Sequence, residues 1–171
     1  MAILTLSEVA RYLRVSEGQH VQDLTLVRDA GEKAISRKCG PLEPTVIVER
    51  FPGSRRAFSL RRTPVISVTS IVPVGSTVEQ SGYNVDLAAG VIEIQSGYFP
   101  ASWYDVTYVA GRANLPDDLR LGILELIKHL WVNWQRGAAG RPSNVPPEPG
   151  AAYLWPYKVQ QLIEPHRQDF P

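Results

Sequence analysis

Apolar residues near the start of the chain recur at helical spacing. Over residues 6–15 this spacing predicts a first helix, and Thr5 with Glu8 has the separation of a capping box. A second apolar stripe over residues 21–39 predicts another helix, because a glycine and a proline follow it directly. Residues 1–40 are therefore expected to form a helical hairpin with one apolar face.

The pattern changes from helical to alternating after this hairpin. Six short runs are rich in β-branched and aromatic residues, and turn-forming residues separate them, which predicts strands. The runs begin at Thr45, Ala57, Val65, Tyr83, Val91 and Tyr104. Their connections are too short for crossover helices, so residues 41–113 are expected to form an antiparallel β-subdomain, either a sheet or a small sandwich.

The strongest apolar pattern predicts a long helix over residues 114–137. Pro116 stands at its first turn and two aspartates follow, which suits the positive end of a helix dipole. Apolar side chains occupy most of its circumference, so we expect packing on two sides, with a neighbouring subunit as a candidate for one of them. The candidate subunit-interface residues are Leu121, Ile127, Trp131 and Trp134.

Residues 138–152 are rich in glycine, alanine and proline and predict an extended linker. The segment 153–171 beyond it is apolar and aromatic, and is expected to be helical after Pro156. An apolar segment that a stiff linker holds away from the core is typical of a docking tail. The candidate docking residues are Tyr153, Trp155, Tyr157, Val159, Leu162 and Ile163.

These elements together predict an α+β fold. Two N-terminal helices and one long helix form a helical bundle, with an inserted antiparallel β-subdomain and an extended C-terminal arm. We expect residues 1–171 to form a single domain, because a chain of 171 residues with 44% hydrophobic and 20% charged residues can bury its own core. The start has no signal-peptide pattern and no apolar run is long enough for a membrane span, so no membrane partner is expected.

Charge and candidate chemistry exclude several function classes. The formal net charge is only +1, so no global basic field indicates nucleic acid. His20, His129 and His166 lie in three different segments without metal-ligand spacing, and Cys39 is interpreted as a small residue filling a helix end. Since no nucleophile elbow or phosphate-binding loop occurs, we expect no enzyme, no cofactor and no metal. A small hydrolase ranks third and last among the candidate functions.

One local concentration of charge leaves a second function open. Five arginines surround the first predicted hairpin, with two phenylalanines between them, at Arg50, Arg55, Arg56, Arg61 and Arg62. They are candidates for contact with DNA or with a neighbouring subunit. The simpler interpretation is a solvated hairpin whose arginines pair with acidic residues. A DNA-binding or packaging accessory protein is therefore the alternative function.

Several short motifs follow one another in an order that resembles a known family. They are Leu6-Ser-Glu-Val-Ala-Arg-Tyr-Leu-Arg-Val15, Thr63-Pro-Val-Ile-Ser-Val-Thr-Ser-Ile71, Tyr83 to Asp86 with Gly90, Val106 to Gly111, Pro116 to Arg120, and Pro156 to Arg167. This succession resembles the head-tail connector, or adaptor, proteins of long-tailed bacteriophages and gene transfer agents. The resemblance covers nearly the whole chain.

The resemblance implies a structural role in a virion, at the head-tail junction, after synthesis in the bacterial host cytoplasm. It implies a homo-oligomeric ring of about twelve copies that matches the portal protein. By the same resemblance, the candidate docking residues at the C-terminus bind the portal. Genomic DNA passes through the lumen of such a ring, and stopper, head-completion or tail proteins attach to it.

Overall fold

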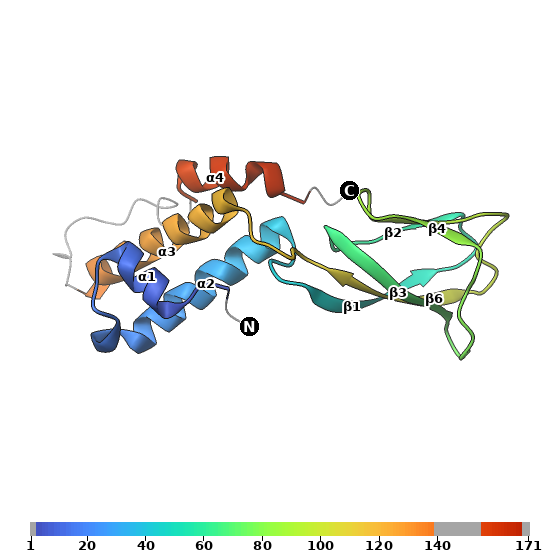
Figure 1. Cartoon of the computed structure of the whole chain (residues 1–171), viewed down its shortest axis with the longest axis horizontal. Helices are drawn as coiled ribbons and strands as arrows, with labels where there is room; N and C mark the ends of the chain where they lie inside the picture. The colour runs from blue at the N-terminus through green and yellow to red at the C-terminus, as the bar shows by residue number, and fades with distance from the viewer. Residues whose placement is uncertain (1–2, 139–154, 169–171) are drawn as a thin grey trace. The chain divides into compact units, whose positions relative to one another are not determined.

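The chain folds into two compact units. The computed structural model describes residues 3–138 and 155–168, with side chains up to residue 133 in the first range. The helical unit combines the chain up to Cys39 with Leu115–Arg167, and the β unit comprises Gly40–Asn114 together with Gln168. Among the described elements, the helices lie in the first unit and the strands in the second (Figure 1). The predicted α+β fold class is confirmed.

The helical unit contains α1 (Leu6–Leu13), η1 (Glu17–Gln19), α2 (Val21–Cys39), α3 (Asp117–Ala138), α4 (Tyr157–Ile163) and η2 (Glu164–His166). The hydroxyl of Thr5 caps α1 by accepting a hydrogen bond of 3.2 Å from the backbone N–H of Glu8, as the capping-box spacing predicts. Helix α3 ends at Ala138, one residue past its predicted end.

Helix α3 is the centre of the helical core. It packs against α1, α2 and α4. Its buried side chains are Leu119, Ile123, Leu124, Leu126, Ile127 and Trp131. On the α2 side, a Cβ added to Gly31 would lie 2.7 Å from Cγ1 of Ile127, so glycine permits the close approach there. The second packed side that the sequence predicts for α3 is supplied by α4 of the same chain, and needs no neighbouring subunit.

The expectation that the C-terminal segment is held away from the core is corrected by α4. Val159 and Ile163 are 0% and 3% exposed and belong to the helical core. Their spacing of four residues places both on one face of the helix. That face packs against α3, where a Cβ added to Gly122 would lie 3.2 Å from Cγ2 of Ile163. The short helix is thus a component of the bundle.

The β unit contains β1 (Thr45–Pro52), β2 (Ala57–Ser59), β3 (Val65–Pro73), β4 (Tyr83–Asp86), β5 (Val91–Ile94) and β6 (Trp103–Ala110). They form two antiparallel three-stranded sheets, in the orders β1-β6-β3 and β2-β5-β4. All six predicted strands are present, and each begins within one residue of its predicted start. The predicted antiparallel β-subdomain is therefore confirmed.

One apolar core joins the inner faces of the two sheets, which makes the β unit a small sandwich. Along β6, alternate side chains from Tyr104 to Ala110 are buried, while those between them face outward. From the other sheet, Phe58 stacks on Phe99 with ring centroids 4.1 Å apart. Each sheet therefore has one buried face and one face open to solvent.

Enlarging Gly31 is expected to destabilise the helical unit. Gly31→Leu would force a side chain into the contact with Ile127, and we expect it to lower the free energy of unfolding by about 1–3 kcal/mol. The matched control is Ala30→Leu on the exposed side of the same helix, with an expected change within about 0.5 kcal/mol. Urea unfolding measures both. Equal losses in the two variants would contradict the tight α2–α3 packing.

Candidate functional site

The candidate docking residues of the C-terminal segment divide into two sets. Val159 and Ile163 lie in the core, whereas the side chain of Tyr157 is 74% exposed. Trp155 and Leu162 are half-buried, and Tyr153 lies outside the described residues. The amide of Gln160 donates a 2.8 Å hydrogen bond to the backbone carbonyl of Trp155, which fixes the entry to α4. Among the described candidate docking residues, Tyr157 therefore has the most accessible side chain.

Two of the candidate subunit-interface residues on α3 serve the core of their own chain. Ile127 is completely buried, and Trp131 is 5% exposed with the ring of His20 edge-on to it at 5.5 Å. The prediction of a subunit seam at these two residues is corrected. Ile127 packs against Gly31 of α2, and Trp131 packs against His20, which directly precedes α2. Leu121 is half-buried. The side chain of Trp134 lies outside the described residues.

The arginine run is divided by the fold. Arg50 donates two hydrogen bonds of 2.7 and 3.0 Å to the carboxylate of Asp105, and this guanidinium holds the pKa of Asp105 below its usual range. Arg56 pairs with Glu93 at 2.8 Å. Asp105 alternates with buried residues of β6, and Glu93 lies between two buried residues of β5. The two ion pairs therefore occupy opposite outer faces of the sandwich.

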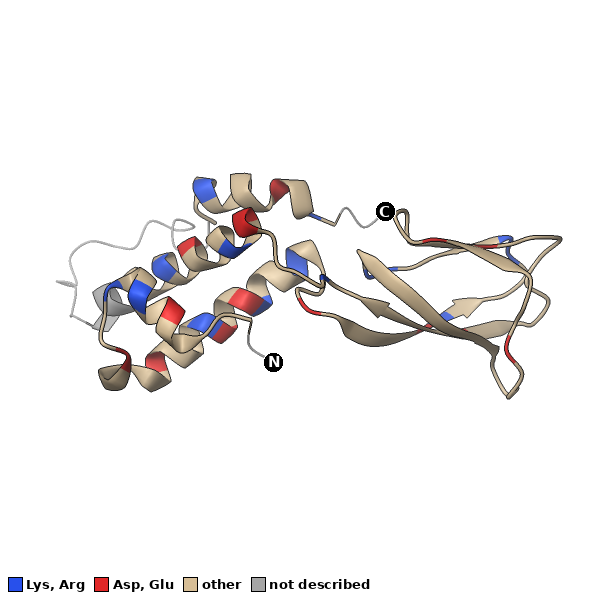
Figure 2. Cartoon of the chain, in the orientation of Figure 1, with Lys and Arg blue, Asp and Glu red and all other residues tan. Residues whose placement is uncertain are grey.

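The other three arginines do not restore a single basic patch. Arg55 precedes β2, whereas Arg61 and Arg62 follow it, so they lie at opposite ends of that strand. All three side chains are exposed. Figure 2 shows the strands largely without charged residues, and residues of both signs along the helices. The geometry favours the simpler interpretation of these arginines as a solvated and partly ion-paired hairpin.

The histidines and the cysteine have structural partners. His166 lies 2.8 Å from the carboxylate of Asp118, and His129 lies 3.0 Å from the amide of Asn133. The buried thiol of Cys39 donates to the carbonyl of Ile163, with 4.0 Å between sulfur and oxygen. Within the described ranges, no three His, Cys, Asp or Glu residues gather as metal ligands.

The structure reveals an apolar surface that the sequence analysis missed. It is the outer face of the β1-β6-β3 sheet, where Val46, Val48 and Trp103 are 67%, 64% and 50% exposed. Val46 pairs across the strands with Val109, and Trp103 pairs with Pro52. The signal in the sequence is the unbroken apolar run near the start of β1. A strand with one face in solvent alternates apolar and polar residues instead. We call Val46, Val48 and Trp103 the outer sheet face.

Comparison with known proteins identifies a shared fold. No protein-family model matches the sequence, and no curated protein does either. A solved structure described as "Virion of native gene transfer agent (GTA) particle" contains a chain 19% identical to this one, with a TM-score of 0.65. The match covers 98% of this chain and 91% of that chain. The two chains share one fold. It includes both the helical bundle and the inserted β unit.

Across residues 3–138 and 155–168, no helix combines the length and the apolar character that a bilayer span requires.

Acidification is expected to loosen both α1 and α4 from α3. Hydrogen bonds from Arg120 and Lys158 lower the pKa values of Glu8 and Glu125 below the ordinary 4.5. Such carboxylates stabilise the fold above their unfolded pKa, and this contribution is lost as pH falls through the lower folded value. We expect hydrogen exchange in both helices to accelerate as the pH is lowered from about 6 to about 3.5, after correction for the intrinsic exchange rates.

A single variant separates the two ion pairs. Lys158→Gln removes the partner of Glu125, so the protection of α4 should become less dependent on pH. The amides of α1 serve as the internal control, because Arg120 still holds Glu8 there. An unchanged pH dependence in α4 would contradict the assignment.

Proposed function

We propose that this chain is a head-tail connector, or adaptor, of a tailed phage or phage-like particle. The observation that carries the proposal is the fold shared over nearly the full length of both chains with a component of a gene transfer agent virion. The order of sequence motifs supports the same family independently. The fold by itself does not fix the function, so the further support comes from the accessible surfaces.

The C-terminal helix supplies the contact with the portal protein in this proposal. Tyr157 is the exposed anchor, and the half-buried Trp155 and Leu162 lie near it in the chain. Aromatic side chains of this kind dominate the energetics of protein interfaces. Val159 and Ile163 act indirectly, because their burial against α3 holds α4 in place.

The outer sheet face supplies a contact between neighbouring copies in the ring. Large apolar side chains in water favour burial against a protein surface. Val46, Val48 and Trp103 lie on one sheet, with the Arg50–Asp105 ion pair between the two ends of the face. A heterologous contact of such a face with a different surface of the next copy closes into a ring. About twelve copies would match the portal and surround the DNA.

The copy number of this chain in purified particles tests the connector proposal. Quantitative mass spectrometry is expected to find it in finished particles, in equal amount to the portal protein. Its absence from finished particles would overturn the proposal. A large excess over the portal would also contradict a ring matched to it.

Removing the exposed aromatic anchor tests the portal contact. Tyr157→Ala is expected to weaken portal binding by about tenfold or more, because it removes the aromatic anchor of the contact. Tyr157 contributes little to its own chain's core, so the fold should be unaffected. Binding is measured by titrating purified portal, and thermal unfolding should be unchanged. Tyr98→Ala is the matched control, since Tyr98 is 67% exposed and lies in the β unit. Equal effects of the two substitutions would contradict the assignment of α4.

A further inference from the structure

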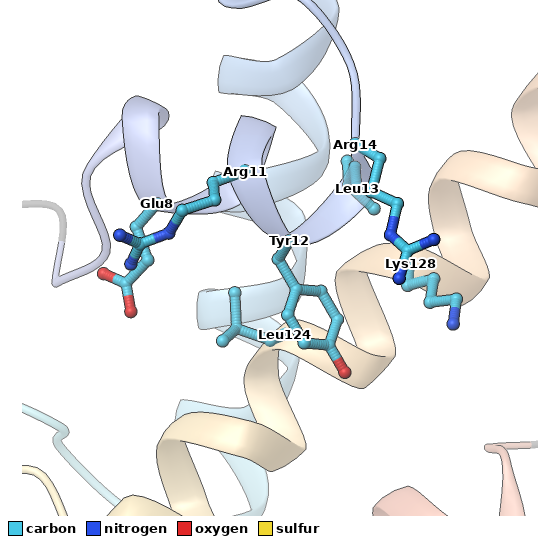
Figure 3. Close-up of a pocket in the computed structure, with 7 residues that line it drawn as sticks. All are labelled: Glu8, Arg11, Tyr12, Leu13, Arg14, Leu124 and Lys128. Atoms are coloured by element: carbon cyan, nitrogen blue, oxygen red, sulfur yellow. The ribbon is translucent and has the colours of Figure 1, made fainter.

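A pocket of about 650 Å³ lies in the helical unit, between the end of α1 and the middle of α3. Its lining residues are Glu8, Arg11, Tyr12, Leu13, Arg14, Leu124 and Lys128. In Figure 3, Tyr12 and Leu124 occupy the centre, Arg14 and Lys128 lie on one side, and Glu8 with Arg11 lies on the other. Of its lining residues only Leu124 also belongs to the helical core, and none belongs to the proposed portal contact.

The pocket carries an excess of positive charge. Among the described lining residues Glu8 is the one carboxylate, and Arg120 holds it through two hydrogen bonds of 2.6 and 2.7 Å. Glu125, the nearest carboxylate on α3, is likewise held by Lys158 of α4. Both acids therefore already have a cation of their own. Arg11, Arg14 and Lys128 form no ion pair with any residue that the structure describes, although Arg11 and Lys128 help to lower the pKa values of Glu8 and Glu125.

The floor of the pocket is apolar and uncharged. Leu124 is buried, and Leu13 and Tyr12 are half-buried. Burial, together with a hydrogen bond to Glu125, raises the pKa of the Tyr12 phenol to about 12, so it stays neutral at physiological pH. A ligand that fits must therefore present an anion to the rim and an apolar group to the floor.

Arg14 has an unusual backbone conformation. Arg14 ends α1 in the left-handed conformation, with φ 59° and ψ 43°. Glycine is the usual residue at such a helix end, because a Cβ disfavours this conformation. An arginine here instead adds a guanidinium to the side of the pocket that already holds Lys128 (Figure 3). Two like charges on one side repel each other, and a bound carboxylate relieves that repulsion.

We propose that this pocket binds an acidic segment of a partner protein. A carboxylate of that segment pairs with Arg14 and Lys128, and an adjacent apolar side chain rests on Tyr12 and Leu124. A protein segment fits better than duplex DNA, because a duplex presents its phosphates on a convex surface and keeps its apolar bases stacked inside. The proposal stands whether or not the chain is a connector.

A synthetic peptide provides the probe. The acetylated and amidated peptide Glu-Leu-Glu-Phe-Glu is titrated into the full chain, and binding is followed by amide chemical shifts. We expect shifts centred on Tyr12, Leu124 and Lys128, and an affinity that falls with added salt. A peptide with lysine in place of glutamate should not bind, and one with glycine in place of Leu and Phe should bind more weakly. No binding by Glu-Leu-Glu-Phe-Glu would overturn the proposal.

Charge-matched variants locate the site. Arg14→Gln with Lys128→Gln is expected to weaken peptide binding about tenfold or more. The control, Lys33→Gln with Arg37→Gln, removes the same charge from exposed positions of α2 outside the pocket and should change the affinity less than about twofold. Thermal unfolding should be unchanged in both pairs. Equal losses in the two pairs would reduce the binding to general charge attraction and overturn the proposal.

Inorganic phosphate and a short DNA duplex are the competing probes. We expect each to bind more weakly than the peptide, because neither places an apolar group on the pocket floor. Tighter binding of the duplex, lost in the variant with Arg14→Gln and Lys128→Gln, would overturn the proposal and assign the pocket to nucleic acid.

Discussion

The apolar circumference of α3 is the constraint on which the helical unit depends. A helix with one apolar stripe needs a single neighbour, but α3 buries side chains against α1, α2 and α4. Gly31 and Gly122 allow its neighbours to approach closely, and ion pairs from Arg120 and Lys158 fasten α1 and α4 around it. The C-terminal segment therefore closes the bundle, and only its outer residues remain for a partner.

The β unit follows a different constraint, which is the alternation of side chains across two packed sheets. This alternation buries the aromatic cluster around Phe58 and turns every second residue outward. The division of the strands between two sheets also separates residues that are neighbours in sequence. Arg50 and Arg56 are close along the chain, but they pair with acids on opposite outer faces of the sandwich. A basic run in a sequence is not a basic surface when it crosses from one sheet to the other.

Three accessible features support the proposed role as an assembly component. They are the exposed Tyr157 on α4, the outer sheet face and the cationic pocket beside Arg14. Tyr157 and the outer sheet face expose apolar surface to water, and Arg14 and Lys128 in the pocket form no ion pair with any described residue. Together with the fold shared with a gene transfer agent particle chain, they form the physical basis of the proposed connector role.

The sequence by itself determined the kind and order of the elements, because helix and strand periods are local properties. The capping pair of Thr5 with Glu8 and the starts of all six strands are such features. Only the tertiary structure decided which apolar residues are core. The same apolar residue types occur in cores and in interfaces, so the sequence does not distinguish the two. The burial of Ile127, Trp131, Val159 and Ile163 depends on where α2 and α4 pack. The pocket was equally hidden, since Arg14 and Lys128 are far apart in the chain, and only the packing of α1 on α3 brings them to one site.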